Sequence, residues 1–99
     1  MVNHIVMGKF KADLSDADKR IALFIIKGGI ESLNDKIRGL KSVSVETLLM
    51  PSSDMDFLVK AKFEDENALM SYRESPIYLP MRSYMQNVLG EFHRVDYHE

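Results

Sequence analysis

The sequence predicts an α+β domain whose four strands form one antiparallel sheet. Apolar and polar residues alternate in four separate stretches, which is the period-2 pattern of strands with one buried face. Between these stretches, two segments carry apolar residues at helical spacing. The predicted elements follow one another in the order βαββαβ within 99 residues, so we expect a single domain.

The first predicted strand spans residues 2–11, and every second side chain lies on the same face. The face that should pack beneath the helices carries His4, Val6, Gly8 and Phe10. Glycine inside a strand often marks a place where another group approaches closely, so we expect a near neighbour at Gly8.

A long helix should follow, beginning after Ser15, whose hydroxyl is suited to cap it, and ending near Arg38, before Gly39. Its apolar residues recur at roughly helical spacing and predict a well-buried helix: Ile21, Phe24, Ile25, Ile26, Ile30, Leu33 and Ile37. The pair Gly28-Gly29 interrupts this pattern and predicts a kink or a close packing contact.

The remaining three strands follow this helix along the chain. Residues 43–50 and 57–63 alternate as strands, and the composition of residues 51–54 predicts a turn between them. Residues 92–98 form the last predicted strand.

The second helix should be broken at Ser75-Pro76. It begins in the acidic segment Glu64-Asp65-Glu66, because negative charge is favoured at a helix N-terminus. Pro76 ends it, since the proline ring disfavours the helical conformation of the residue before it. A second helical piece should then run to Leu89, with Pro80 in its first turn. This arrangement is the ferredoxin-like order.

Composition excludes several classes of function. The chain has 13 basic and 15 acidic side chains, and this balance argues against nucleic-acid binding, which requires a basic surface. The absence of cysteine excludes disulfides, thiolate catalysis and cysteine-ligated metal sites. The N-terminal apolar run is too short for a signal peptide or a membrane span, so we expect a cytoplasmic protein without membrane contact.

Four segments in order resemble the stress-responsive A/B barrel (Dabb) family: NHIVMGKFK, IRGLKSVSVE, FEDENALMSYRESPIY and VDYHE. The resemblance covers nearly the whole chain and implies one Dabb-like domain over residues 1–99. It also implies a homodimer in which two four-stranded sheets form a dimeric α+β barrel. The sheet face without helices favours this pairing, because it would expose an apolar patch made by Ile5, Met7, Leu48, Met50 and Leu58.

The same resemblance suggests site residues. His4 stands where the family usually has a histidine in its first strand, and Tyr72 matches the tyrosine that the cyclase branch uses beside its catalytic histidine. The family commonly continues with His-Pro-any-His, whereas this chain has Ser75-Pro76-Ile77-Tyr78. The second missing histidine is the general base proposed for the cyclase branch, so the resemblance implies that cyclase chemistry of that type is lost.

We therefore expect a cleft between sheet and helices, lined by His4, Val6, Tyr72 and Tyr78, that binds a small apolar molecule. The alternative is a cofactor-free enzyme, a polyketide cyclase, a lyase or a monooxygenase-like protein, with His4 and Tyr72 as the acid–base pair. A structural homo-oligomer is a further alternative, in which His4 only bonds to a partner inside the core.

We expect neither a metal nor another cofactor. His93 and His98 lie at an odd offset in the last predicted strand, which places them on opposite faces and makes a shared metal ion unfavourable.

Overall fold

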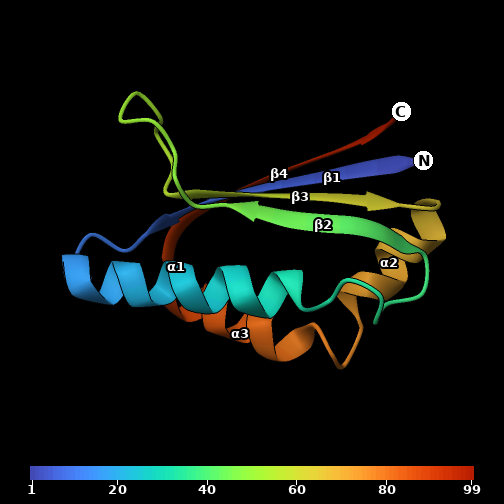
Figure 1. Ribbon diagram of the computed structural model, residues 1–99, viewed down its shortest axis with the longest axis horizontal. Helices are drawn as coiled ribbons and strands as arrows, with labels where there is room; N and C mark the ends of the chain where they lie inside the picture. The colour runs from blue at the N-terminus through green and yellow to red at the C-terminus, as the bar shows by residue number, and fades with distance from the viewer.

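The computed structural model describes residues 1–99 and shows a four-stranded antiparallel sheet with every helix on one of its faces (Figure 1). The elements in chain order are β1 (Val2–Phe10), α1 (Asp16–Glu31), β2 (Leu40–Glu46), β3 (Phe57–Phe63), α2 (Glu66–Arg73), α3 (Leu79–Val88) and β4 (Leu89–His98). The sheet has the order β2-β3-β1-β4, so β1 lies between β3 and β4. The predicted ferredoxin-like α+β fold, with its second helix broken around Ser75-Pro76, is confirmed.

The core lies between the sheet and the helices. From β1 and β3, the side chains that face the helices are buried: Val2, His4, Val6, Phe10, Phe57, Val59, Ala61 and Phe63. Ile26 and Ile30 of α1 and Leu69 of α2 pack onto them from the helix layer. The period-2 alternation of both strands therefore identified the buried face correctly.

Gly8 makes room for an aromatic ring in this core. A Cβ atom at Gly8 would lie 2.4 Å from Cζ of Phe57, whose side chain is completely buried. The near neighbour that the sequence predicted at Gly8 is thus the Phe57 ring.

The first helix ends earlier than predicted and is less buried than predicted. It ends at Glu31 rather than near Arg38, because the Asn34 side chain bonds to the β2 backbone and Asp35 takes a left-handed conformation with φ of 67°. The expectation of a well-buried helix is also wrong, since Phe24 is 82% exposed on the outer surface.

The two adjacent glycines of α1 have different surroundings, although the helix continues through both. A Cβ atom at Gly29 would lie 2.0 Å from Cε of Met81, so the close packing predicted here occurs between α1 and α3. Gly28 faces open space.

Side chains of α1 cover the outer edge of β2. Asn34 accepts a hydrogen bond from the Val43 N–H at 3.0 Å and donates one to the Val43 carbonyl at 2.9 Å. The Glu31 carboxylate accepts from the Val45 N–H at 2.9 Å, and the Lys27 ammonium donates to the Val45 carbonyl at 2.8 Å. These four bonds satisfy backbone groups that a strand at the edge of a sheet usually exposes.

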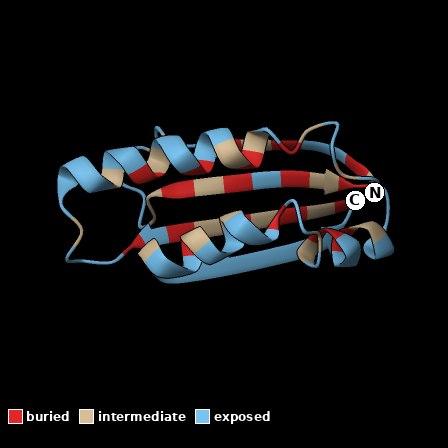
Figure 2. Ribbon diagram, turned by 90° about the horizontal axis from the view of Figure 1, so that it is seen from below, coloured by how far each residue is buried: buried red, intermediate tan, exposed pale blue.

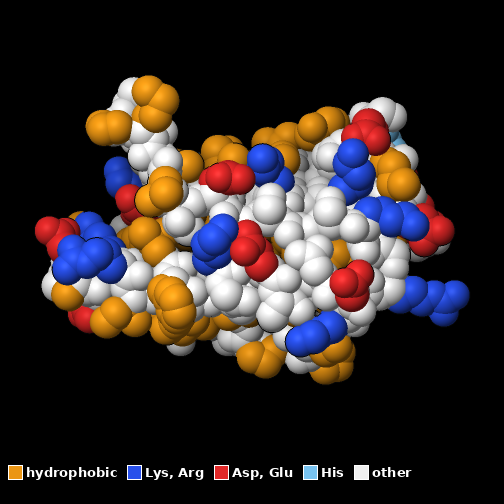
Figure 3. Space-filling view, in the orientation of Figure 1, with side chains coloured by type: hydrophobic (Ala, Val, Ile, Leu, Met, Phe, Trp, Pro, Cys, Tyr) orange, Lys and Arg blue, Asp and Glu red, His pale blue; other side chains and the backbone are white.

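Strand β2 ends at Glu46 rather than at Met50, because β3 pairs with it only as far as the Glu46–Leu58 position. Residues 47–56 instead form a loop that rises on the side of the sheet without helices (Figure 1). Leu48 is 97% exposed in this loop, and Figure 3 shows hydrophobic side chains at its tip.

Strand β4 follows α3 directly and begins at Leu89, three residues earlier than predicted. It pairs with β1 alone, and its residues from Gly90 onward are exposed. Figure 2 shows its exposed ribbon at the edge of the sheet, beside α3.

Gly8→Ala should destabilise the protein, whereas Gly28→Ala should stabilise it. The first substitution forces a methyl group against the buried Phe57 ring and should lower the free energy of unfolding by about 1–3 kcal/mol. The second meets no neighbour and removes a helical glycine, so it should raise this free energy by up to about 1 kcal/mol. Urea denaturation at one protein concentration measures both, and equal stability of the Gly8→Ala variant and the wild type would contradict the packing described.

Candidate functional site

A cleft of about 430 Å³ lies between β4 and the two short helices α2 and α3. Its lining comes from β1, β4, α2, α3 and the segment between the two short helices: His4, Tyr72, Arg73, Glu74, Tyr78, Arg82, Met85, Gln86, Leu89, Phe92 and Arg94. Its volume is within the range of small-molecule sites.

Two regular patterns supply two facing walls of the cleft. Tyr78, Arg82 and Met85 follow one another at intervals of four and three residues, so they lie on the same face of α3. Phe92 and Arg94 are two residues apart on β4 and face the same side of the sheet. The cleft is therefore formed between one helix face and one strand face that turn toward each other.

A charged network connects three of the lining residues, His4, Arg73 and Arg94, through Asp96. Asp96 lies opposite His4 in the β1–β4 register, and one of its carboxylate oxygens bonds to Nδ1 of His4. The other oxygen accepts from Nη2 of Arg73 at 2.6 Å, and Nε of Arg94 lies 3.9 Å from it. Asp96 thus connects β4 with β1 and with α2.

The environment of His4 favours a neutral imidazole with a defined tautomer. Burial lowers the pKa of His4 below its ordinary value of 6.5 and outweighs the Asp96 carboxylate, which raises it. A neutral His4 donates from Nδ1 to Asp96, so its lone pair lies on Nε2. This nitrogen is suited to accept a proton or a hydrogen bond.

Two tyrosines pack beside His4. The Tyr72 and Tyr78 rings stack with centroids 4.3 Å apart, and His4 meets the Tyr72 ring edge-on at 6.1 Å. Burial raises the pKa of Tyr72 and of Tyr78 above the ordinary value of 10.0. For Tyr78 the cations Arg82, Arg73 and Arg94 act in the opposite direction, since they favour a phenolate. Both hydroxyls therefore stay protonated at neutral pH and serve as hydrogen-bond donors.

The structure brings three of the four predicted site residues to this cleft, namely His4, Tyr72 and Tyr78. Val6 does not line it, because it pairs with Val59 in the sheet and is buried in the core. His93 and His98 lie opposite Met7 and Val2 of β1, on the two different faces of β4.

The sequence analysis did not identify the cations of the site or the role of Asp96. The cations are Arg73, Arg82 and Arg94. The alternation of Phe92, Arg94 and Asp96 could have placed Arg94 and Asp96 on the helix side of β4. Only the register then shows that Asp96 meets His4.

Comparison with known families assigns the chain to one of them. The profile described as Stress responsive A/B Barrel Domain matches residues 2–99 of the chain. The chain belongs to the Dabb family. No curated protein sequence matches it.

Solved structures share the Dabb fold at low sequence identity. A dimeric protein of unknown function from Bacteroides fragilis has a TM-score of 0.93 and 21% identity over 99% of this chain and 95% of its own. A Dabb family protein from Mesorhizobium loti has a TM-score of 0.74 and 21% identity over the same shares of the two chains. The hydroxynitrile lyase from Passiflora edulis has a TM-score of 0.73 and 18% identity over 97% of this chain and 90% of its own.

At these identities the likeness shows the fold alone, so the relatives do not decide between binding and catalysis. None of the three helices combines the length and the apolar composition needed to cross a membrane.

The buried His4 should make the protein less stable as the pH falls below 6.5. Its pKa is lower in the folded state, so the unfolded chain binds more protons in this range. This contribution is complete above pH 6.5 and is lost as the pH falls toward the folded pKa. Asp96→Asn should lower the pKa of His4 further, because the carboxylate raises it.

Nuclear magnetic resonance titration of the His4 ring measures this pKa, and urea denaturation across the same pH range measures the stability. His98→Gln, at an exposed position on the opposite face of β4 from His93, serves as the control. A folded pKa above 6.5 for His4 would contradict the dominance of burial.

Proposed function

We propose that this Dabb protein binds a small, largely apolar molecule in the cleft between β4, α2 and α3. The observation that carries the proposal is the apolar wall of the cleft. Tyr78 and Met85 are buried in the core yet border the cleft, and Leu89 and Phe92 continue the same wall onto β4. Phe92 remains 45% exposed, and apolar surface of this kind, rimmed by polar residues, is typical of a ligand site.

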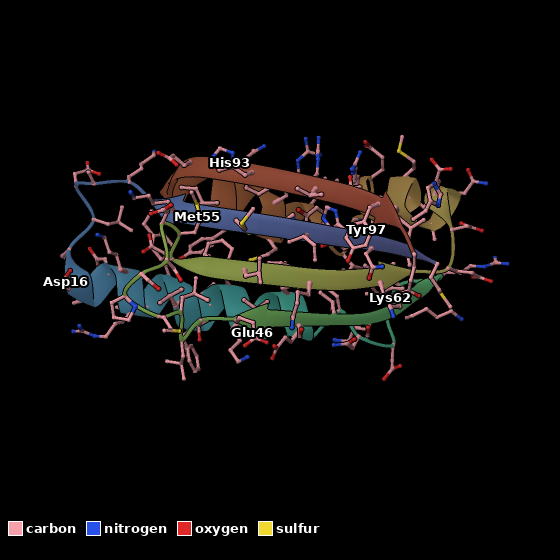
Figure 4. All side chains as sticks on the ribbon, turned by 90° about the horizontal axis from the view of Figure 1, so that it is seen from above. Asp16, Glu46, Met55, Lys62, His93 and Tyr97 are labelled. Atoms are coloured by element: carbon pink, nitrogen blue, oxygen red, sulfur yellow. The ribbon has the colours of Figure 1, made fainter.

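We also infer that the functional unit is a homodimer joined through the sheet face without helices, as the Bacteroides fragilis structure is described as dimeric. Apolar side chains run across this face from β4 through β1 to β3: Val95, Tyr97, Ile5, Met7 and Leu58. Figure 4 shows this face with Tyr97 and Lys62 near one end and Met55 near the other. The loop of residues 47–56 rises on the same side, where it would contact a second copy.

The charges of this face are compatible with pairing. Lys60 lies 3.6 Å from Glu46, and Lys62 lies 2.8 Å from Glu99. Because these cations already have acidic partners within the chain, a second copy would not bury them as isolated charges.

The His4–Asp96 pair favours cofactor-free acid–base catalysis as a second candidate function. It orients an imidazole whose Nε2 is free to act as a base, and the protonated Tyr72 ring lies beside it. The hydroxynitrile lyase from Passiflora edulis shares the fold, so mandelonitrile is a reasonable first substrate. If the wild type releases benzaldehyde and the His4→Gln variant does not, catalysis rather than simple binding is the better assignment of function.

Phe92→Ala should weaken binding of 1-naphthol, a neutral aromatic probe. The substitution removes one wall of the cleft and should raise Kd roughly fivefold, which corresponds to about 1 kcal/mol. Phe24→Ala is the matched control, because Phe24 is also exposed but lies on the outer surface of α1. Isothermal titration calorimetry measures both variants. Equal affinity of Phe92→Ala and the wild type, or no binding by the wild type at millimolar probe, would count against the proposal.

The mass in solution should be about twice the 11.4 kDa of one chain. Val95→Lys places a charge in the middle of the proposed interface, where an unpaired ion costs several kcal/mol, and should shift the protein to the monomer. Ile21→Lys is the control, since Ile21 is exposed on α1. Light scattering at micromolar concentration measures both, and a monomeric wild type would exclude the barrel.

A further inference from the structure

Three arginines surround the cleft, and two of them have no close acidic partner. Arg73 is bonded to Asp96 at 2.6 Å. Arg82 forms no ion pair in the chain, and Arg94 only approaches Asp96 at 3.9 Å, where both carboxylate oxygens already have partners. Glu74 also borders the cleft but forms no ion pair with any of these arginines. The cleft therefore has an excess of positive charge beside an apolar wall.

The positive charge gathers at one end of the cleft. Arg94 lies five residues after the turn at Leu89, or about 16 Å along a strand. Tyr78 lies eleven residues before this turn, or about 16 Å along a helix, so it meets Arg94 across the cleft. Arg82 is one helical turn from Tyr78. Arg82, Arg73 and Arg94 all act on the ionisation of Tyr78, which agrees with their convergence on its hydroxyl.

The other end of the cleft is mainly apolar. Met85, Leu89 and Phe92 lie toward the turn between α3 and β4, and Gln86 is the polar lining residue among them. A ligand that fills the whole cleft would therefore meet apolar groups at one end and cations with a phenol donor at the other.

We propose that the ligand of this cleft is a small carboxylic acid whose carboxylate lies between Arg82 and Arg94, beside the Tyr78 hydroxyl, and whose apolar body lies on Met85, Leu89 and Phe92. This inference rests on the proposed binding function and specifies its ligand. Guanidinium groups bind carboxylates through paired, charge-assisted hydrogen bonds, and a neutral phenol adds a further donor. The Arg73 side chain also lines the cleft, and its buried Nε has no acceptor in the chain.

A pair of probes that differ only in charge tests the proposal. 4-Ethylbenzoate and 4-ethylbenzamide have the same apolar body, and calorimetry should show the carboxylate binding about tenfold more tightly. Arg82→Gln and Arg94→Gln should each remove most of this preference, because they weaken binding of the carboxylate much more than binding of the amide. Arg20→Gln, an exposed arginine of α1 without an ion pair, should behave as the wild type.

The outcomes distinguish a wrong carboxylate assignment from a wrong binding function. Equal affinity for the two probes would overturn the carboxylate assignment, yet the binding function would stand. Binding of neither probe at millimolar concentration would overturn both. 4-Ethylphenylphosphonate is the third arm, and tighter binding of this probe than of the carboxylate would assign the cations to a phosphate group and overturn the proposal. Thermal unfolding of each variant shows that loss of binding is not loss of fold.

Discussion

The Asp96 carboxylate is the interaction on which the site depends, because it joins the last strand to His4 of the neighbouring strand and to Arg73 of α2. β4 forms its ladder with β1 alone, and its residues from Gly90 onward are exposed. One oxygen of Asp96 bonds to His4 of β1, and the other bonds to Arg73 at the end of α2. The same carboxylate therefore attaches the last strand to the helix layer and sets the tautomer of the buried histidine.

The break in the second helix explains why there is a cleft beside this carboxylate. One continuous helix from Glu66 to Val88 would be about 34 Å long, whereas the seven residues of β3 extend over only about 23 Å. Because the helix is divided at Ser75-Pro76, both pieces stay over the sheet. Tyr78 then lies at the start of α3, where its ring stacks on Tyr72. The cleft lies between these two short pieces and β4.

The sequence was sufficient for the fold because each strand shows its buried face directly in the alternation of its residues. It was insufficient wherever a tertiary contact decides where an element ends. Asn34 ends α1 because its amide bonds to a strand that lies further along the chain. Leu48 and Met50 resemble the continuation of β2, but the paired part of β3 has no partner for them.

The same reasoning applies to the site. His4 could be predicted because it interrupts an apolar strand face, and Tyr72 and Tyr78 because they flank the helix break. Arg82 and Arg94 belong to elements with many polar residues, where a single cation has no distinguishing pattern. Their relation becomes visible only when the turn at Leu89 brings α3 and β4 face to face.

The bonds from α1 to the outer edge of β2 have a consequence for how copies of the chain associate. An exposed strand edge is a template on which further strands add, and unlimited addition of this kind leads to fibres. Here Lys27, Glu31 and Asn34 occupy the backbone groups of Val43 and Val45 that an incoming strand would need. A second chain would have to displace all four bonds before it could extend the sheet on this side. Growth by strand addition is thereby blocked at β2.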